Sequence, residues 1–131
     1  MKGFTLVECL VAMVILIIIV AGLGPLMINN IRSAKINEIR EETLYQCNKV
    51  LSHLISLKFD DSCLAIGIDK SCAVDTSLCC GDEAGNNNIK WKVTNGPVAN
   101  TKEITVTGNF YYSNYMGQVT LKYIKGDWNE N

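Results

Sequence analysis

Residues 9–28 read CLVAMVILIIIVAGLGPLMI, and this stretch decides how the rest of the chain must fold. Twelve of its twenty residues are Leu, Ile or Val, and none is charged. As a helix that rises about 1.5 Å per residue, twenty residues span roughly 30 Å, the thickness of a bilayer's hydrocarbon core. The remainder of the 131-residue chain is ordinary polar and amphipathic sequence. We therefore predict a membrane-anchored protein whose larger part lies outside the bilayer.

The composition narrows the class of protein further. The chain is 48% hydrophobic and 19% charged, with a formal net charge of −1. A nucleic-acid-binding protein needs a dominant basic face to neutralise phosphates, so this balance argues against one. The low charge also argues against a disordered chain. A cleavable secretory signal is disfavoured, because Lys2 is the only basic residue upstream and Pro25 directly follows a poor cleavage site.

Glu8 stands at the front edge of the apolar stretch, where a plain membrane anchor has no use for a carboxylate. An ionised acid costs up to about 2.5–3.5 kcal/mol at the bilayer centre. A carboxylate in a membrane is therefore a functional hypothesis that needs a partner. The plain alternative is that Glu8 snorkels to the membrane edge.

The segment GFTLVE at residues 3–8, followed by the apolar stretch, resembles the N-terminal signature of type IV prepilins and of type II secretion pseudopilins. The resemblance implies that a dedicated membrane peptidase cuts between Gly3 and Phe4. It also implies that the same processing N-methylates the new amine of Phe4. In that family many members place a helix-kinking proline at the position of Pro25, so Gly24 and Pro25 are our candidate kink.

The chemistry of Glu8 can be argued from the residues as well. Cleavage would leave a positive amine on Phe4, four residues from Glu8 and on the same helix face. Glu8 can pair with the amine of its own chain or of a neighbouring chain. Breaking a buried ion pair costs about 3–5 kcal/mol, so a pair between chains would fix the axial register of the subunits. We predict that Glu8 forms an assembly salt bridge.

An apolar stripe continues the helix beyond the membrane stretch. Its members recur every three or four residues, and occasionally five, as on one face of an amphipathic helix. We predict one helix from residue 4 to about residue 57, with residues 1–3 as the leader, 4–28 as the membrane and assembly half, and 29–59 as the amphipathic half. The stripe consists of Ile28, Ile31, Ile36, Ile39, Leu44, Cys47, Val50, Leu51, Leu54 and Ile55.

Residues 60–88 hold four cysteines and are expected to form a loop. Their spacing does not match paired zinc-binding CxxC motifs, so we predict no metal site. An oxidising compartment outside the cytoplasm favours disulfides instead. Adjacent Cα atoms lie about 3.8 Å apart, which suits a bridge poorly, so the two adjacent cysteines should each pair elsewhere. The candidates are Cys63, Cys72, Cys79 and Cys80, while Cys9 and Cys47 are expected to be buried free thiols, with Cys47 as a competing partner.

Residues 89–131 alternate between apolar and polar side chains, which predicts half-buried antiparallel strands. The clearest runs are residues 89–94, 103–107 and 119–124, with turn residues at 95–97 and 114–117. A three- or four-stranded sheet packed on the apolar face of the helix would give an α+β, type IV pilin-like fold. Sheet packing is also our first interpretation of a run of aromatic residues, and a binding surface is the second; the run is Phe110, Tyr111, Tyr112 and Tyr115.

Residues 90–107 are also similar to the sheet region of certain minor pilins that are often described as pilus-modification proteins. This looser resemblance implies a minor subunit, one that aids pilus initiation or lies at the tip. The residues that carry it are Trp91, Val93, Pro97, Asn100, Thr101, Lys102, Ile104 and Val106.

The sequence therefore predicts a minor pilin or pilin-like structural subunit of a type IV pilus, with no catalytic residues, cofactor, metal or nucleic-acid partner. The resemblance implies four partners: the prepilin peptidase and methylase, other major and minor pilins, the inner-membrane assembly platform, and the lipid bilayer before assembly. The precursor would cross the cytoplasmic membrane once, N-terminus inside, and later reach the pilus at the cell surface. Three alternatives remain: a type II secretion pseudopilin, a membrane-anchored adhesin or ligand-binding module, and a membrane-tethered thiol redox protein.

Overall fold

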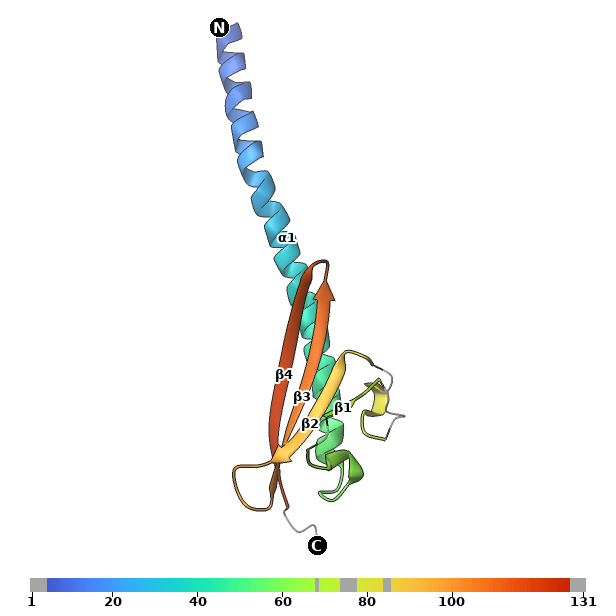
Figure 1. Cartoon of the computed structure of the whole chain (residues 1–131). Coiled ribbons are helices and arrows are strands. Elements are labelled where there is room, and N and C mark those ends of the chain that lie inside the picture. The colour runs from blue at the N-terminus through green and yellow to red at the C-terminus, as the bar shows by residue number, and fades with distance from the viewer. Residues whose placement is uncertain (1–4, 68, 74–77, 84–85, 128–131) are drawn as a thin grey trace. The chain divides into compact units, whose positions relative to one another are not determined.

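The computed structural model of the chain describes residues 5–67, 69–73, 78–83 and 86–127. The chain divides into two compact units, Met1–Asn37 and Glu38–Asn131. Helix α1 (Leu6–Ser56) contributes to both. The described residues of the second unit also contain the 3-10 helices η1 (Ser62–Leu64) and η2 (Gly81–Glu83) and the strands β1 (Asp69–Ser71), β2 (Ile89–Asn95), β3 (Thr101–Tyr112) and β4 (Tyr115–Gly126) (Figure 1).

The described part of the first unit is the N-terminal stretch of α1. Residues 5–35 are all exposed, although most of those up to Ile31 are apolar. The most hydrophobic window of 18 residues has a mean hydropathy of 3.0, and none of it is buried. A helix that is apolar all round needs an apolar environment, either lipid or the helices of other chains. The helix is unbroken through Gly24 and Pro25, and the kink suggested for that position stays a prediction.

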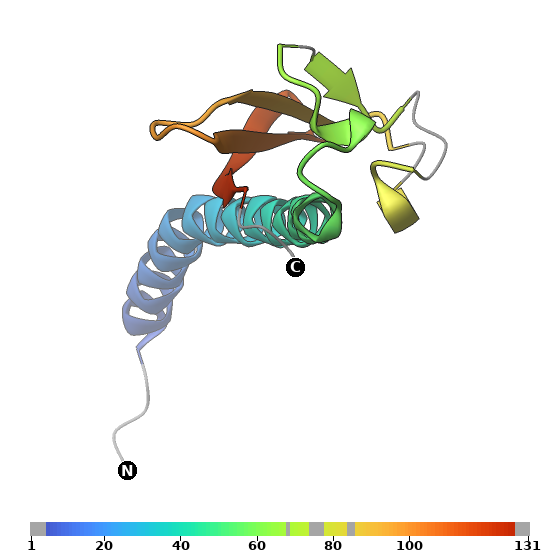
Figure 2. The ribbon, with the colours of Figure 1, turned by 90° about the horizontal axis from the view of Figure 1, so that it is seen from below.

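The second unit packs an antiparallel sheet against the C-terminal part of α1. The strand order is β1-β2-β3-β4, and each neighbouring pair is antiparallel. Figure 2 shows the strands lying over one side of the helix. This arrangement confirms the predicted α+β, pilin-like fold. The core joins α1 to β2 and β3 through Cys47, Val50, Leu51, Leu54, Ile89, Trp91, Val93, Ile104 and Val106.

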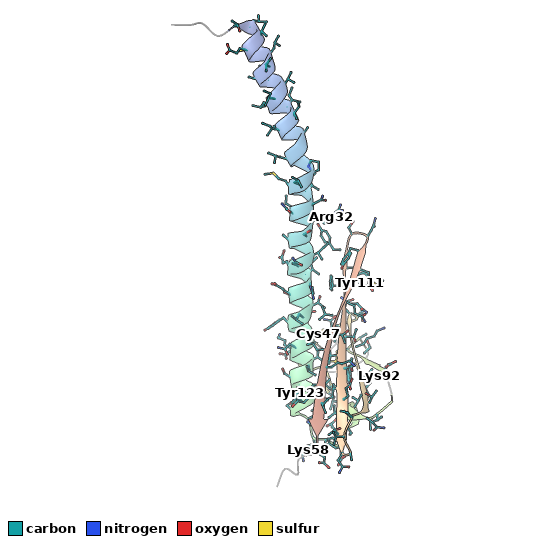
Figure 3. The ribbon with its side chains drawn as sticks, turned by 90° about the vertical axis from the view of Figure 1, so that its left-hand side faces the viewer. Arg32, Cys47, Lys58, Lys92, Tyr111 and Tyr123 are labelled. Atoms are coloured by element: carbon teal, nitrogen blue, oxygen red, sulfur yellow. A yellow bond between two sulfur atoms is a disulfide. The ribbon has the colours of Figure 1, made fainter. Side chains whose placement is uncertain are left out.

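The closest approach of helix and sheet is at Gly108 of β3. A Cβ atom added at Gly108 would lie 2.5 Å from Cys47 Sγ and 2.7 Å from Thr43 Cγ2, so only glycine fits there. The buried hydroxyl of Thr43 is satisfied within the helix, because it donates to Ile39 O at 2.9 Å. Figure 3 shows Cys47 between α1 and the sheet.

Two lysines of the sheet hold the C-terminal end of α1 and the residues that directly follow it. Lys125 Nζ donates to Ile55 O at 2.6 Å and also to Leu57 O. Lys102 Nζ donates to Phe59 O at 2.5 Å. The last carbonyls of a helix have no intrahelical donor, and cations there are also favoured by the helix dipole. The open ends of β3 and β4 are thereby fixed beside the end of the helix.

Three details of the second unit differ from the sequence-based expectation. The cysteine-rich region is not only loop, because β1 lies within it and pairs with β2. The turn between β3 and β4 comprises residues 113–114, and Gly117 belongs to β4. A Cβ at Gly117 would lie 2.2 Å from Phe110 Cζ, so this glycine leaves room for the ring of its cross-strand partner. In the helix, Ile28, Ile31 and Leu44 of the apolar stripe are exposed.

Candidate functional site

The first candidate site is the N-terminal turn of α1. Glu8 lies in this turn, where its N–H donates to Thr5 O at 3.0 Å. Its side chain is exposed. The positive end of the helix dipole favours a carboxylate at this position. The cleavage and methylation residues Gly3 and Phe4 lie outside the described residues, so their roles, like the salt bridge of Glu8, stay predictions.

The surface that surrounds this carboxylate is almost purely apolar. Glu8 is the only charged residue between residues 5 and 31. The large apolar side chains of this stretch are 52–77% exposed. An acid at one end of such a surface is costly in lipid or in a bundle of helices unless a cation pairs with it. The arrangement therefore suits an intermolecular ion pair formed within an apolar interface.

The cysteine-rich region is closed by two disulfides, which confirms the expectation of disulfide bonds. Cys63 is bonded to Cys79 with Cα atoms 5.4 Å apart, and Cys72 to Cys80 with Cα atoms 5.7 Å apart. The adjacent cysteines thus take separate partners. The region is also attached to its surroundings, because Trp91 Nε1 donates to Cys63 O at 3.1 Å. These contacts make it a structural element of the second unit.

The two remaining cysteines differ in their surroundings. Cys47 is fully buried and forms no disulfide. Burial and, to a smaller extent, the negative charge of Glu83 together raise the pKa of its thiol from 9.0 to about 11. A thiol in that state is a poor nucleophile, so Cys47 acts as a small apolar core residue. Cys9 is exposed rather than buried, on the surface that a bilayer would cover.

The described residues offer little for catalysis or metal binding. Among them, no group of three His, Cys, Asp or Glu side chains is placed to hold a metal ion. An open groove of about 420 Å³ beside the disulfides is lined by residues that include Lys49, His53 and Asp82. His53 Nε2 lies 3.1 Å from Leu78 O, so one ring nitrogen already has a partner. The groove is a surface feature between α1 and η2.

The aromatic run at the end of β3 is only partly packed. Phe110 is 5% exposed, as sheet packing predicts, and its ring centroid lies 6.2 Å from that of Tyr115. Tyr111 and Tyr115 are 59% and 50% exposed, together with Met116 at 66%. Tyr111 is labelled in Figure 3. Sheet packing is our first interpretation of this run from its sequence, and a binding surface is the second; Phe110 is packed, whereas Tyr111 and Tyr115 are exposed. The available signal was the alternation along β3, which places Tyr111 on the face opposite Phe110.

Comparison with known proteins gives one family match. The prokaryotic N-terminal methylation motif matches the chain at residues 1–24. No curated protein and no solved structure matches the chain. The match therefore concerns the stretch that holds Gly3, Phe4, Glu8 and most of the apolar surface.

Proposed function

We propose, from the premise that this chain is type IV prepilin-like by its N-terminal methylation motif, that it is a minor structural subunit of a type IV pilus. In this role it aids pilus initiation or lies at the tip. The observation that carries the proposal is Glu8, the only charged residue between residues 5 and 31, a stretch of α1 that is exposed and mostly apolar.

The helix has to serve two environments in succession. As a precursor, the chain is held in the cytoplasmic membrane, with the N-terminus inside, by the apolar stretch of α1. Prepilin peptidase then cuts between Gly3 and Phe4, and the amine of Phe4 is methylated. On the assembly platform, α1 leaves lipid and packs among the helices of other pilins. There Glu8 meets the Phe4 amine of a neighbouring subunit, because an unpaired carboxylate in that interface is unfavourable.

The proposal is tested by replacing the carboxylate. Glu8→Ala should insert into the membrane normally but be lost from sheared surface fibres. Removing one member of a buried ion pair costs about 3–5 kcal/mol of free energy, which corresponds to association at least a hundredfold weaker. Glu41→Ala is the matched control, since Glu41 is an exposed acid in the amphipathic half of the same helix. Normal incorporation of Glu8→Ala would refute the proposed role.

Processing is tested by mass spectrometry of the mature protein. We expect its first residue to be Phe4 with one methyl group on the amine. Recovery of a chain that still begins at Met1 and never co-purifies with fibres would contradict the proposal. Deletion should impair surface fibres; a defect in protein secretion instead would identify a type II secretion pseudopilin.

A further inference from the structure

Strand β3 extends beyond the strand that lies beside it on one side. β2 begins at Ile89, which pairs with Gly108, whereas β3 continues from Asn109 to Tyr112 (Figure 1). On the other side, β4 pairs with each of these last residues of β3. Among the residues that the structure describes, no strand lies beside residues 109–112 on the side of β2. We call residues 109–112 the open edge of β3.

The ladder shows which backbone groups the open edge presents. Asn109 N donates to Asn88 O at 2.9 Å, so the odd-numbered residues of β3 direct their N–H and C=O groups toward β2. Asn88 N would return this bond to Asn109 O, but it donates to the side chain of Asn86 at 3.0 Å instead. Within the described part of the chain, Asn109 O and both backbone groups of Tyr111 therefore face the open side with no hydrogen-bond partner.

A groove of about 490 Å³ lies along the open edge. It is lined by Asn109, Phe110 and Tyr111 on one side and by a face of α1 that includes Glu42 on the other. Asn88, the residue before β2, lines it as well. The groove therefore begins where β2 ends, and all of its lining residues belong to the second unit. An extended chain that lies in the groove can continue the sheet beside β3.

The groove is also negatively charged. Glu38 and Glu42 are exposed acids that lie one helical turn apart on α1, and none of the described residues that line the groove is basic. Glu42 Oε1 accepts a long hydrogen bond of 3.4 Å from Gln46 Nε2, so the second carboxylate oxygen can accept from a ligand. Tyr111 is 59% exposed, and its ring adds a surface that favours a cation. The charge of the groove thus complements a basic side chain.

We propose that this groove binds an extended, basic segment of another protein chain, which adds a strand beside the open edge of β3. The backbone of the segment bonds with Asn109 O and with the N–H and C=O of Tyr111. The residue opposite Phe110 lies on the face toward α1, as Phe110 does, and its Lys or Arg side chain reaches Glu42. The open edge selects an extended backbone, and the carboxylates select a cation. The site lies within the second unit and does not depend on the subunit proposal.

The experiment measures binding of a synthetic peptide to the full-length protein in detergent micelles. The probe is a capped, rhodamine-labelled peptide of sequence TVTRTVT, whose arginine and valines share one face in a strand, and fluorescence anisotropy reports its binding. The comparison peptide, TVTETVT, carries glutamate in place of arginine. Glu42→Gln removes the charge but keeps the shape of the side chain. Glu41→Gln is the matched control, because Glu41 is an exposed acid of α1 that does not line the groove.

We expect the arginine peptide to bind and the glutamate peptide to show no binding at the same concentrations. Glu42→Gln should weaken binding about fivefold, the effect of losing one ion pair at a partly exposed site. Glu41→Gln should leave the affinity unchanged. Equal binding of the two peptides, or equal affinity of Glu42→Gln and the wild type, overturns the inference.

Methylation of the peptide amides tests strand addition directly. The threonines that flank the arginine direct their N–H groups toward β3 in the proposed complex, and N-methylation of both should abolish binding. The valines direct their N–H groups away from β3, and N-methylation of both should change the affinity by less than about twofold. Equal losses from the two methylated peptides, or no loss from either, would overturn the inference, because a bound peptide that is not a strand lacks this alternation.

Discussion

Replacing Gly108 by alanine should loosen the packing of the sheet on α1. The added Cβ would lie 2.5 Å from Cys47 Sγ and 2.7 Å from Thr43 Cγ2, about 0.9 and 0.7 Å short of the 3.4 Å at which ordinary contact begins. Neither neighbour can move aside easily, since Cys47 is fully buried and Thr43 is 6% exposed. Overpacking of a filled core lowers the free energy of unfolding by about 1–3 kcal/mol. Because two clashes occur together here, we expect a loss of about 3 kcal/mol.

The assay is guanidinium unfolding of the full-length protein in detergent, followed by the fluorescence of buried Trp91 in a Trp128→Phe background. The denaturant concentration at the midpoint should fall, while the slope of the unfolding free energy against denaturant concentration stays unchanged. This combination indicates lost stability rather than a different unfolded state. Gly22→Ala is the matched control, because nothing lies within 4 Å of an added Cβ there. It should leave the unfolding of the second unit unchanged.

Removing the clashing atoms should restore part of the stability lost by Gly108→Ala. Cys47→Ala removes the sulfur, and Thr43→Ser removes Cγ2 while keeping the hydroxyl that bonds Ile39 O. The triple variant should therefore be more stable than the sum of the separate effects implies. The reasoning is refuted if Gly108→Ala unfolds within about 0.5 kcal/mol of the wild type, the range of ordinary surface substitutions.

Two further predictions concern the cysteines. Replacing both cysteines of one disulfide by serine, either Cys63 with Cys79 or Cys72 with Cys80, should lower the free energy of unfolding by about 2–4 kcal/mol. The measurement is chemical unfolding without reductant, and unchanged midpoints for both paired variants would contradict this prediction. Burial raises the pKa of Cys47, so the unfolded thiol ionises first as pH rises from 9.0 to about 11, and the free energy of unfolding should fall over that window. Cys47→Ala should remove this part of the fall, and an identical pH profile in both proteins would show that the buried thiol does not contribute.

Much of the fold could be predicted because it depends on local patterns. The length and charge of residues 9–28 predict a membrane helix, and alternation near Trp91 and Val106 predicts strands with those residues inside. The geometry of adjacent Cys79 and Cys80 correctly predicts separate partners. Each of these inferences uses the period of a helix or strand, or the spacing of neighbouring Cα atoms.

The prediction was incomplete wherever contacts join distant parts of the chain. The choice between Cys63 and Cys72 as the partner of Cys79, and the need for glycine at position 108, depend on how the loop and the sheet meet the helix. The exposure of Tyr115 likewise depends on how far the hairpin extends past its packed region. The sequence by itself determined the processing motif, the apolar helix and the strand faces, since short-range periodicity and hydrophobicity specify them. Only the tertiary structure decided the disulfide pairing, the close approach at Gly108 and the exposure of Tyr115, because each depends on the distance between residues that are far apart along the chain.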